Sequence, residues 1–336
     1  MAASRRRFVT QKVVFAVLTV FAVITFNFFL FRVLPGDPAV GGLRDPRLSP
    51  ERVEALRERF GVDNPVFLNF DGGNVFESQY FAYLGALSDG DLGTSFAFRD
   101  QQVTTLLGQA LINTLWLVVP AQIISIVLGV GLGLIAAYRR GTRVDVSALT
   151  FSLIMWSLPT FFLGIVLLFV GTTWLDLPAA GRVTIGAQYT DLWDQLADIV
   201  SHMILPTATL ALVLLGEYML IMRSSVVEVL GEDYILTARA MGIRRPKILR
   251  SHAFRNAMLP IVTLIALNLG FTVSGAIQVE TVFSWPGLGH LTVDAVNQRD
   301  FPVLQGAFLL LALSVVVANL IVELIYGYLD PRVKEA

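Results

Sequence analysis

The 336-residue sequence contains no cysteine and little charge. Without cysteine the chain can form no disulfide and no thiolate nucleophile, and redox chemistry gives no information about its compartment. Charged residues make up 15% of the chain, whereas soluble globular proteins have about 25%. The formal net charge is −1, which argues against a nucleic-acid-binding domain. The composition therefore excludes a disordered chain and a typical soluble enzyme.

The sequence also lacks the common catalytic and nucleotide-binding motifs. It has no Gly-x-x-x-x-Gly-Lys-Ser/Thr stretch, and none of its lysines, Lys12, Lys247 and Lys334, follows a glycine, so it has no phosphate-binding P-loop. Gly-x-Ser-x-Gly and His-Glu-x-x-His are missing. The three histidines do not show metal-ligand spacing. We therefore expect no catalytic residue, no metal site and no cofactor bound by this chain.

Long hydrophobic stretches are what the sequence has instead. Hydrophobic residues make up 55% of the chain, and the mean hydropathy is +0.67. A bilayer core needs roughly 20 apolar residues of helix, and a lone strand cannot satisfy its backbone in lipid. The sequence therefore predicts an all-α integral membrane protein. Its six expected transmembrane helices lie at 13–33, 110–138, 147–173, 202–222, 258–279 and 303–326.

The basic residues predict how these helices are oriented. Lysines and arginines gather near both termini, after the second stretch and after the fourth, whereas the two short loops on the opposite side contain only Arg182 and Arg299. Basic loops remain in the cytoplasm, so both termini are predicted to be cytoplasmic. The first stretch could alternatively be a signal peptide, but LPGDP at 34–38 follows it instead of a small-residue cleavage site. A retained helix is the favoured interpretation.

Two long loops are predicted to have structure of their own. The outer loop at 34–109 contains helical patterns at 49–61 and 76–87 and could be a solvated cap or a docking platform. In the inner loop at 223–255, Asp233 is expected to cap a short helix that Gly242 ends, and Pro246 to begin a second one. The inner loop could lie on anionic lipid or insert a helix into a partner's groove.

Polar, proline and glycine residues interrupt the apolar stretches. The asparagines could bond neighbouring helices or contact a substrate. Glu217 and Glu323 could be helix-end carboxylates, or groups of an inner vestibule or of a subunit interface. Prolines 120, 159 and 206 should kink their helices, and glycines 129, 131 and 133 should let another helix approach. The polar residues considered as candidates for a translocation pathway are Asn27, Asn113, Asn268, Asn319, Glu217 and Glu323.

Several motifs together resemble one known family. In chain order they are LPGDP at 34–38, GDLGTSF at 90–96, EDYILTARAMG at 232–242, RNAMLP at 255–260, ETVFSWPGLG at 280–289 and LDPR at 329–332. In this order and over nearly the whole chain, they resemble the permease subunit of dipeptide/oligopeptide (peptide/nickel) ABC importers. The resemblance implies the MetI-like fold of type I ABC importer permeases, with a permease core at 110–330 and cytoplasmic ends at 1–12 and 331–336.

The resemblance also implies partners and site residues. It implies a second permease subunit, a paralogue, with which the chain shares the translocation pathway. It further implies two ATPase subunits that bind ATP and magnesium, an extracytoplasmic substrate-binding protein, a prokaryotic inner membrane and no nucleic acid. The residues implied for coupling to the ATPase are Asp233, Tyr234, Thr237, Ala238, Arg239, Ala240 and Gly242, of which the small ones are expected to be exposed. Those implied for an outer gate or docking site are Glu280, Trp285, Pro286 and Gly287.

Other functions stay open at this point. Related importers carry nickel, antimicrobial peptides or oligosaccharides, so the substrate is less firmly indicated than the transport function. A secondary transporter or channel would be expected to show internal repeats and a chain of ionisable groups in its helices. A membrane enzyme would need a convergent catalytic cluster. The sequence shows none of these features, which favours a permease powered by a separate ATPase.

Overall fold

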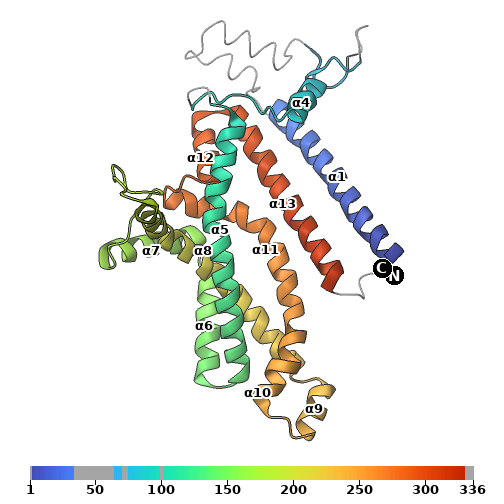
Figure 1. Ribbon diagram of the computed structural model, residues 1–336, viewed down its shortest axis with the longest axis vertical. Helices are drawn as coiled ribbons and strands as arrows, with labels where there is room; N and C mark the ends of the chain where they lie inside the picture. Colours follow the sequence, from blue (N-terminus) through green and yellow to red (C-terminus); the bar gives the residue numbers. More distant parts are fainter. Residues whose placement is uncertain (1, 34–63, 70–74, 99–100, 330–336) are drawn as a thin grey trace. The chain divides into compact units, whose positions relative to one another are not determined.

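The computed structural model describes residues 2–33, 64–69, 75–98 and 101–329; for 2–6, 266, 269–275, 322 and 325–329 it describes the backbone alone. Within these ranges the regular elements are helices, and one isolated bridge joins Thr94 to Gln102 (Figure 1). The elements are α1 (Ala2–Val33), α4 (Gln79–Ser88), α5 (Val103–Tyr138), α6 (Arg143–Ser157), α7 (Thr160–Trp174), α8 (Leu192–Val229), α9 (Asp233–Ala240), α10 (Arg245–Ile248), the π-helix η1 (Leu249–Ala253), α11 (Phe254–Val282), α12 (Leu288–Gln298) and α13 (Phe301–Leu329).

Four helices of the described chain are long and apolar enough to cross a membrane. They comprise Arg7–Arg32, Val103–Tyr138, Leu192–Val229 and Phe301–Ile321, and they coincide with the first, second, fourth and sixth predicted helices. The fifth predicted helix, 258–279, lies within α11, a continuous helix of 29 residues, but its crossing of the membrane stays a prediction. The chain is therefore an all-helical membrane protein with four candidate spans, or five if α6 and α7 together form one, and the predicted number of six is not confirmed.

The third predicted helix, 147–173, is not one continuous helix. The chain instead forms α6 and α7, which meet at an angle of 107°. Leu158 has ψ 133, in the extended region, because the ring of the following Pro159 disfavours a helical conformation there. The expected proline kink is therefore confirmed at Pro159, whereas Pro120 and Pro206 lie inside continuous helices.

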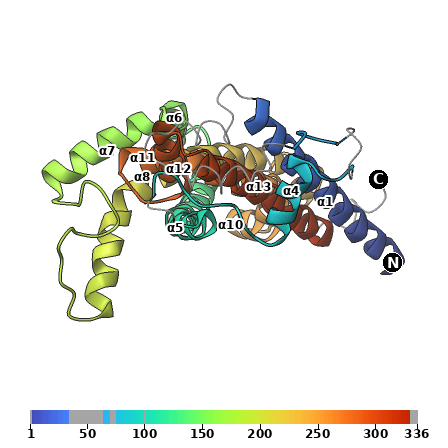
Figure 2. The same cartoon turned by 90° about the horizontal axis from the view of Figure 1, so that it is seen from above.

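Two other predicted boundaries are also wrong. The fourth span begins at Leu192 rather than residue 202, because Asp191 caps the helix by accepting hydrogen bonds from the backbone of Trp193 and Asp194. Figure 2 shows the loop before α8 and the start of α8, in yellow-green, at the left edge of the view. The same helix continues to Val229, so the separate inner segment starts later than residue 223. The N-cap residue, and not the length of the uncharged stretch, therefore marks where this helix begins.

The described part of the predicted outer loop contains one of its two expected helices. The pattern at 76–87 corresponds to α4, which Ser78 caps by accepting a hydrogen bond from the backbone of Phe81. The helix expected at 49–61, LPGDP, and all of LDPR except Leu329 lie outside the described residues. Phe28 of α1 packs edge-on against Tyr80 of α4, with ring centroids 5.2 Å apart. Aromatic contacts of this kind hold α4 against α1.

The chain divides into two compact units, residues 1–112 with 290–320 and residues 113–289 with 321–336. Helix α8 is the centre of the second unit and packs against α6, α7 and α11. Glycines bring the helices together: a Cβ at Gly129 or Gly133 of α5 would lie within 2.8 Å of Tyr218, Met219 or Met222 on α8. The expected close approach is confirmed at these two glycines and wrong at Gly131, which faces open space.

Candidate functional site

The short helix α9 and its neighbour α10 form a small cluster of their own. Ile235 and Ala238 of α9 pack against Ile248 of α10, and all three are buried. Between the two helices Gly242 has φ +76, a conformation that side chains with a Cβ rarely adopt. The prediction of a helix ended by Gly242 is confirmed (Figure 1).

Two details of this prediction are wrong. Glu232, not Asp233, occupies the N-cap position of α9, and its side chain makes no capping hydrogen bond. Ala238 was expected to be exposed, but it is 3% exposed because it faces α10. The helix must bury one face to stay attached to the protein, and residues three apart, such as 235 and 238, share that face.

The opposite face of α9 is largely exposed, and its link to α11 is the hydrogen bond that the Asn256 amide donates to the Tyr234 hydroxyl at 2.7 Å. Tyr234, Leu236 and Met241 are 42%, 52% and 68% exposed, and Thr237 and Ala240 are exposed beside them. Exposed apolar side chains grouped on one short helix indicate an interaction surface. Arg239 is exposed as well, and its guanidinium donates to the carbonyl of Leu230 at 3.2 Å.

Two arginines connect this segment and α8 to the turn between α5 and α6. Arg245 of α10 donates to the carbonyl of Tyr138 at 2.8 Å, and its guanidinium lies 4.8 Å from the Tyr138 ring centroid. Arg223 of α8 makes a two-point ion pair with Asp145 of α6, at 2.6 and 2.8 Å. Asp145 also accepts from the backbone of Gly141. Sequence reasoning missed these contacts, because charges at helix ends usually face solvent.

The ETVFSWPGLG motif forms the tight turn between α11 and α12. Ser284 has φ 47, and the backbone N–H of Trp285 donates to the carbonyl of Glu280 at 2.8 Å. This is the Schellman arrangement that commonly ends helices, here with serine in the left-handed position that glycine usually occupies. Five residues, 283–287, therefore connect α11 to α12.

Side chains of α5 and α11 fix this turn from within the second unit. The Glu280 carboxylate is fully buried and accepts from the Thr114 hydroxyl at 2.6 Å and from the Gly289 backbone at 2.7 Å. The Trp285 indole donates to the carbonyl of Asn113, whose amide donates to the carbonyl of Pro286. Each buried polar group is satisfied in this way, as a buried network requires.

A glycine at position 287 is required by this packing. A Cβ there would lie 2.2 Å from a carboxylate oxygen of Glu280, far inside contact distance. Glu280, Trp285 and Gly287 are all buried, and Pro286 is the exposed member of the predicted outer gate or docking set. Direct docking through the three buried residues is thus not available in this conformation, and a gating role stays a prediction.

The predicted pathway residues are not gathered at one place. Asn27 of α1 donates to the carbonyl of Gln305 on α13 at 3.1 Å, and Asn268 of α11 donates to Glu217 of α8 at 3.0 Å. With Asn113, these contacts support the interpretation of asparagines as links between helices. Asn319 is exposed and Glu323 is half-buried on α13. A role of any of the six in a pathway stays a prediction.

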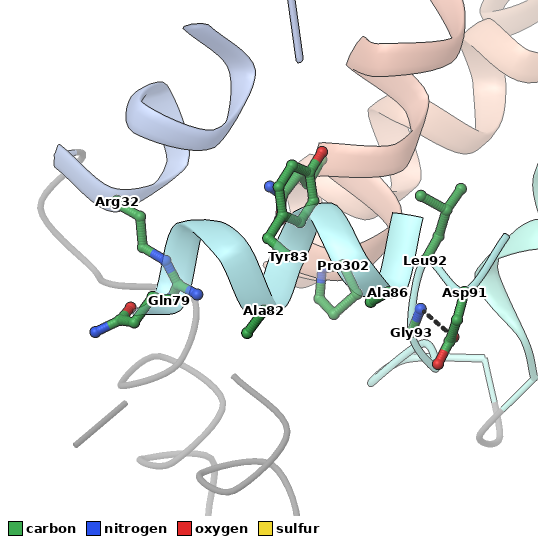
Figure 3. A pocket seen from close by; sticks show the side chains of 10 residues that line it. Arg32, Gln79, Ala82, Tyr83, Ala86, Asp91, Leu92, Gly93 and Pro302 are labelled. Atoms are coloured by element: carbon green, nitrogen blue, oxygen red, sulfur yellow. Dashed lines mark hydrogen bonds between the residues drawn. The ribbon is translucent and has the colours of Figure 1, made fainter. Parts of the chain in front are cut away.

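The first unit has a polar cluster and a small pocket. Asp300 accepts hydrogen bonds from Ser95 and from the backbone of Ala97, which joins the GDLGTSF motif to the start of α13. Figure 3 shows the pocket nearby, with Arg32, Gln79 and Asp91 among its lining residues. Its volume of about 40 Å³ suits ordered water rather than a peptide.

A larger groove lies on the second unit between α5 and α8. Its volume is about 490 Å³, and its walls are almost entirely apolar, with Ile124, Met203 and Leu212 among the lining residues. A peptide with charged ends would lose its hydration there without compensation. In the part of the chain that the structure describes, no group of three or more His, Asp or Glu side chains could hold a metal ion.

Known protein families and relatives match nearly the whole chain. The family described as "Binding-protein-dependent transport system inner membrane component" matches residues 129–335, and the corresponding N-terminal family matches residues 5–118. The chain is 36% identical over 345 residues to the dipeptide transport system permease protein DppB of Escherichia coli (strain K12), covering 98% of each protein. It is 30% identical to the oligopeptide transport system permease protein AppB of Bacillus subtilis (97% of this chain, 99% of AppB). It is 34% identical to the glutathione transport system permease protein GsiC of Escherichia coli O6:H1 (97% and 98%).

Proposed function

Because the chain belongs to the family of binding-protein-dependent transport system inner membrane components, we propose that it is the permease subunit of an ATP-driven importer of di- or oligopeptides. It is a multi-pass membrane protein and not itself an enzyme. The relatives named for dipeptide, oligopeptide and glutathione transport cover nearly the whole chain. Their substrates share a peptide backbone, which favours peptides over nickel or oligosaccharides as the cargo.

The exposed face of α9 is the observation that supports the coupling mechanism best. The chain has no phosphate-binding motif, so ATP and magnesium bind to separate ATPase subunits. A contact that bears force must then connect those subunits to the membrane helices. Helix α9 offers such a contact through Tyr234, Leu236 and Ala240, and its buried face ties it to α10. We assign α9 as the coupling helix.

The remaining parts of the assembly follow from this assignment. A binding protein delivers the peptide on the opposite side of the membrane, and a second permease, a paralogue, completes the translocation pathway. Both termini and α9 are cytoplasmic, in agreement with the distribution of basic residues. The turn between α11 and α12 then lies at the outer side.

Uptake by the purified complete importer in proteoliposomes tests this function. Labelled alanyl-alanine should accumulate only when ATP and the binding protein are both present, whereas nickel and maltotriose should not. Accumulation of nickel or of the sugar in place of the dipeptide would contradict the peptide assignment. Transport without ATP would contradict the importer assignment and would favour a secondary transporter.

A further inference from the structure

Helix α8 carries a single carboxylate in the middle of an otherwise uncharged stretch. Between Asp198 and Arg223 the only Asp, Glu, Lys or Arg is Glu217. It precedes Arg223 by six residues, which is about 9 Å along the helix axis. Glu217 is half-buried. Ionisable side chains at such depths in membrane helices are rare and usually functional.

One hydrogen bond from α11 holds this carboxylate, and its donor belongs to a polar network that links α5, α8 and α11. The Asn268 amide of α11 donates to Glu217 Oε2 at 3.0 Å and lies 3.4 Å from the Tyr218 hydroxyl. That hydroxyl also accepts a hydrogen bond from Gln122 of α5. Tyr218 and Gln122 are 0% and 4% exposed. The buried side chains of Tyr218 and Gln122 thus orient Asn268, and Asn268 in turn orients the half-buried Glu217 carboxylate. Binding groups in proteins are commonly positioned by such a supporting layer.

Glu217 has no compensating positive charge within the part of the chain that is described. No lysine, arginine or histidine there lies within 4.0 Å of its carboxylate, and its hydrogen-bond donor is the neutral Asn268 amide. Leu267, next to Asn268 in α11, is 51% exposed. An ionised carboxylate in a membrane helix is stabilised by a cation, which must here come from outside the described chain.

We propose that Glu217, oriented by Asn268, is a transient binding site for the ammonium group of a peptide crossing the membrane. The inference rests on the proposed peptide transport and adds a recognition site to it. The amino terminus of a peptide is largely protonated at neutral pH, and its cation can pair with Glu217. A half-buried carboxylate with one neutral donor binds weakly enough to release its ligand, as passage requires.

Charge and hydrogen bonding can be separated at this position. Glu217→Gln keeps an oxygen that accepts from Asn268 but removes the charge, and Glu217→Asp keeps the charge. Glu228→Gln is the matched control, because Glu228 is an exposed carboxylate on the same helix. Each variant is measured in the complete importer in proteoliposomes with labelled alanyl-alanine. The KM, the maximal uptake rate, ATP hydrolysis and subunit stoichiometry are recorded.

We expect Glu217→Gln to lower the maximal uptake rate about tenfold with an unchanged KM, because the binding protein sets KM. Glu217→Asp should retain more of the rate than Glu217→Gln because it keeps the charge, and Glu228→Gln should match the wild type. Normal uptake by Glu217→Gln would overturn the site and leave the importer function intact. If the Glu217→Gln complex loses subunits, the proposed peptide site is also overturned. The positive charge that pairs with Glu217 would then come from a partner subunit and not from the peptide. If the wild-type importer carries no di- or oligopeptide, the proposed function itself fails.

Discussion

The turn after α11 and the short helix α9 both consist of motif residues, yet they use them in opposite ways. In the turn, Glu280, Trp285 and Leu288 are 0% exposed and bonded inside the chain. On α9 Leu236 is 52% exposed, and Met241 at its C-cap is 68% exposed. A motif in the turn thus specifies internal structure, whereas a motif in α9 specifies a surface. Substitutions should therefore affect stability in the first region and coupling in the second.

The largest loss of stability is expected from Gly287→Ala. The new Cβ would lie 2.2 Å from Glu280, so the turn must open or the buried carboxylate must move. We expect the free energy of unfolding to fall by about 3 kcal/mol or more, measured as thermal unfolding of the detergent-solubilised importer. Gly131→Ala is the control, because a Cβ there meets nothing within 4 Å. Equal stability of the two variants would show that the turn is not tightly packed.

A smaller loss is expected where α6 is fixed to α8. Asp145→Asn removes the charge that pairs with Arg223, whose side chain is 20% exposed. We expect a decrease of about 2 kcal/mol in the free energy of unfolding. Comparing Asp145→Asn, Arg223→Gln and the double variant by thermal unfolding isolates the pair. Strictly additive effects would mean that the two side chains do not stabilise each other.

Two neighbouring alanines of α9 should separate packing from coupling. Ala238→Trp inserts a large ring between α9 and α10 and should reduce the free energy of unfolding by about 1–2 kcal/mol. Ala240→Trp projects from the exposed face and should change it by less than about 0.5 kcal/mol. Both should abolish dipeptide uptake, but only Ala240→Trp should do so with α9 intact, which resistance of the Arg239 peptide bond to trypsin would show. Normal uptake by Ala240→Trp would contradict the coupling assignment.

The smallest effect on the protein is expected from single cysteines that report sidedness. The natural chain has no cysteine, and Ser284 and Lys247 are exposed in the turn and on α10. In intact cells an impermeant maleimide should label Ser284→Cys and not Lys247→Cys, while permeabilised cells should show both. Labelling of Lys247→Cys from outside would reverse the proposed orientation.

Local patterns were sufficient to predict several parts of the fold. Apolar stretches predicted the positions of four candidate spans, because roughly 20 apolar residues of helix suffice to cross a bilayer. Gly242 predicted the end of α9, because its conformation is rare for other residues. Pro159 predicted a kink, although not that the kink would reach 107°. The start of α8 could have been predicted from Asp191, a good N-cap, had capping been weighed above charge spacing.

The sequence alone determined that this is an all-helical membrane protein of a transport family, since hydropathy and motif order are properties of the linear chain. Only the tertiary structure decided which motif residues are buried. Glu280 accepts from Thr114, 166 positions away, and Arg223 pairs with Asp145, 78 positions away. Such contacts depend on which helix faces pack together. Small residues such as Gly129 and Gly133 allow α5 and α8 to come close together and so determine which faces meet. A local sequence pattern does not indicate which distant side chain will be the partner.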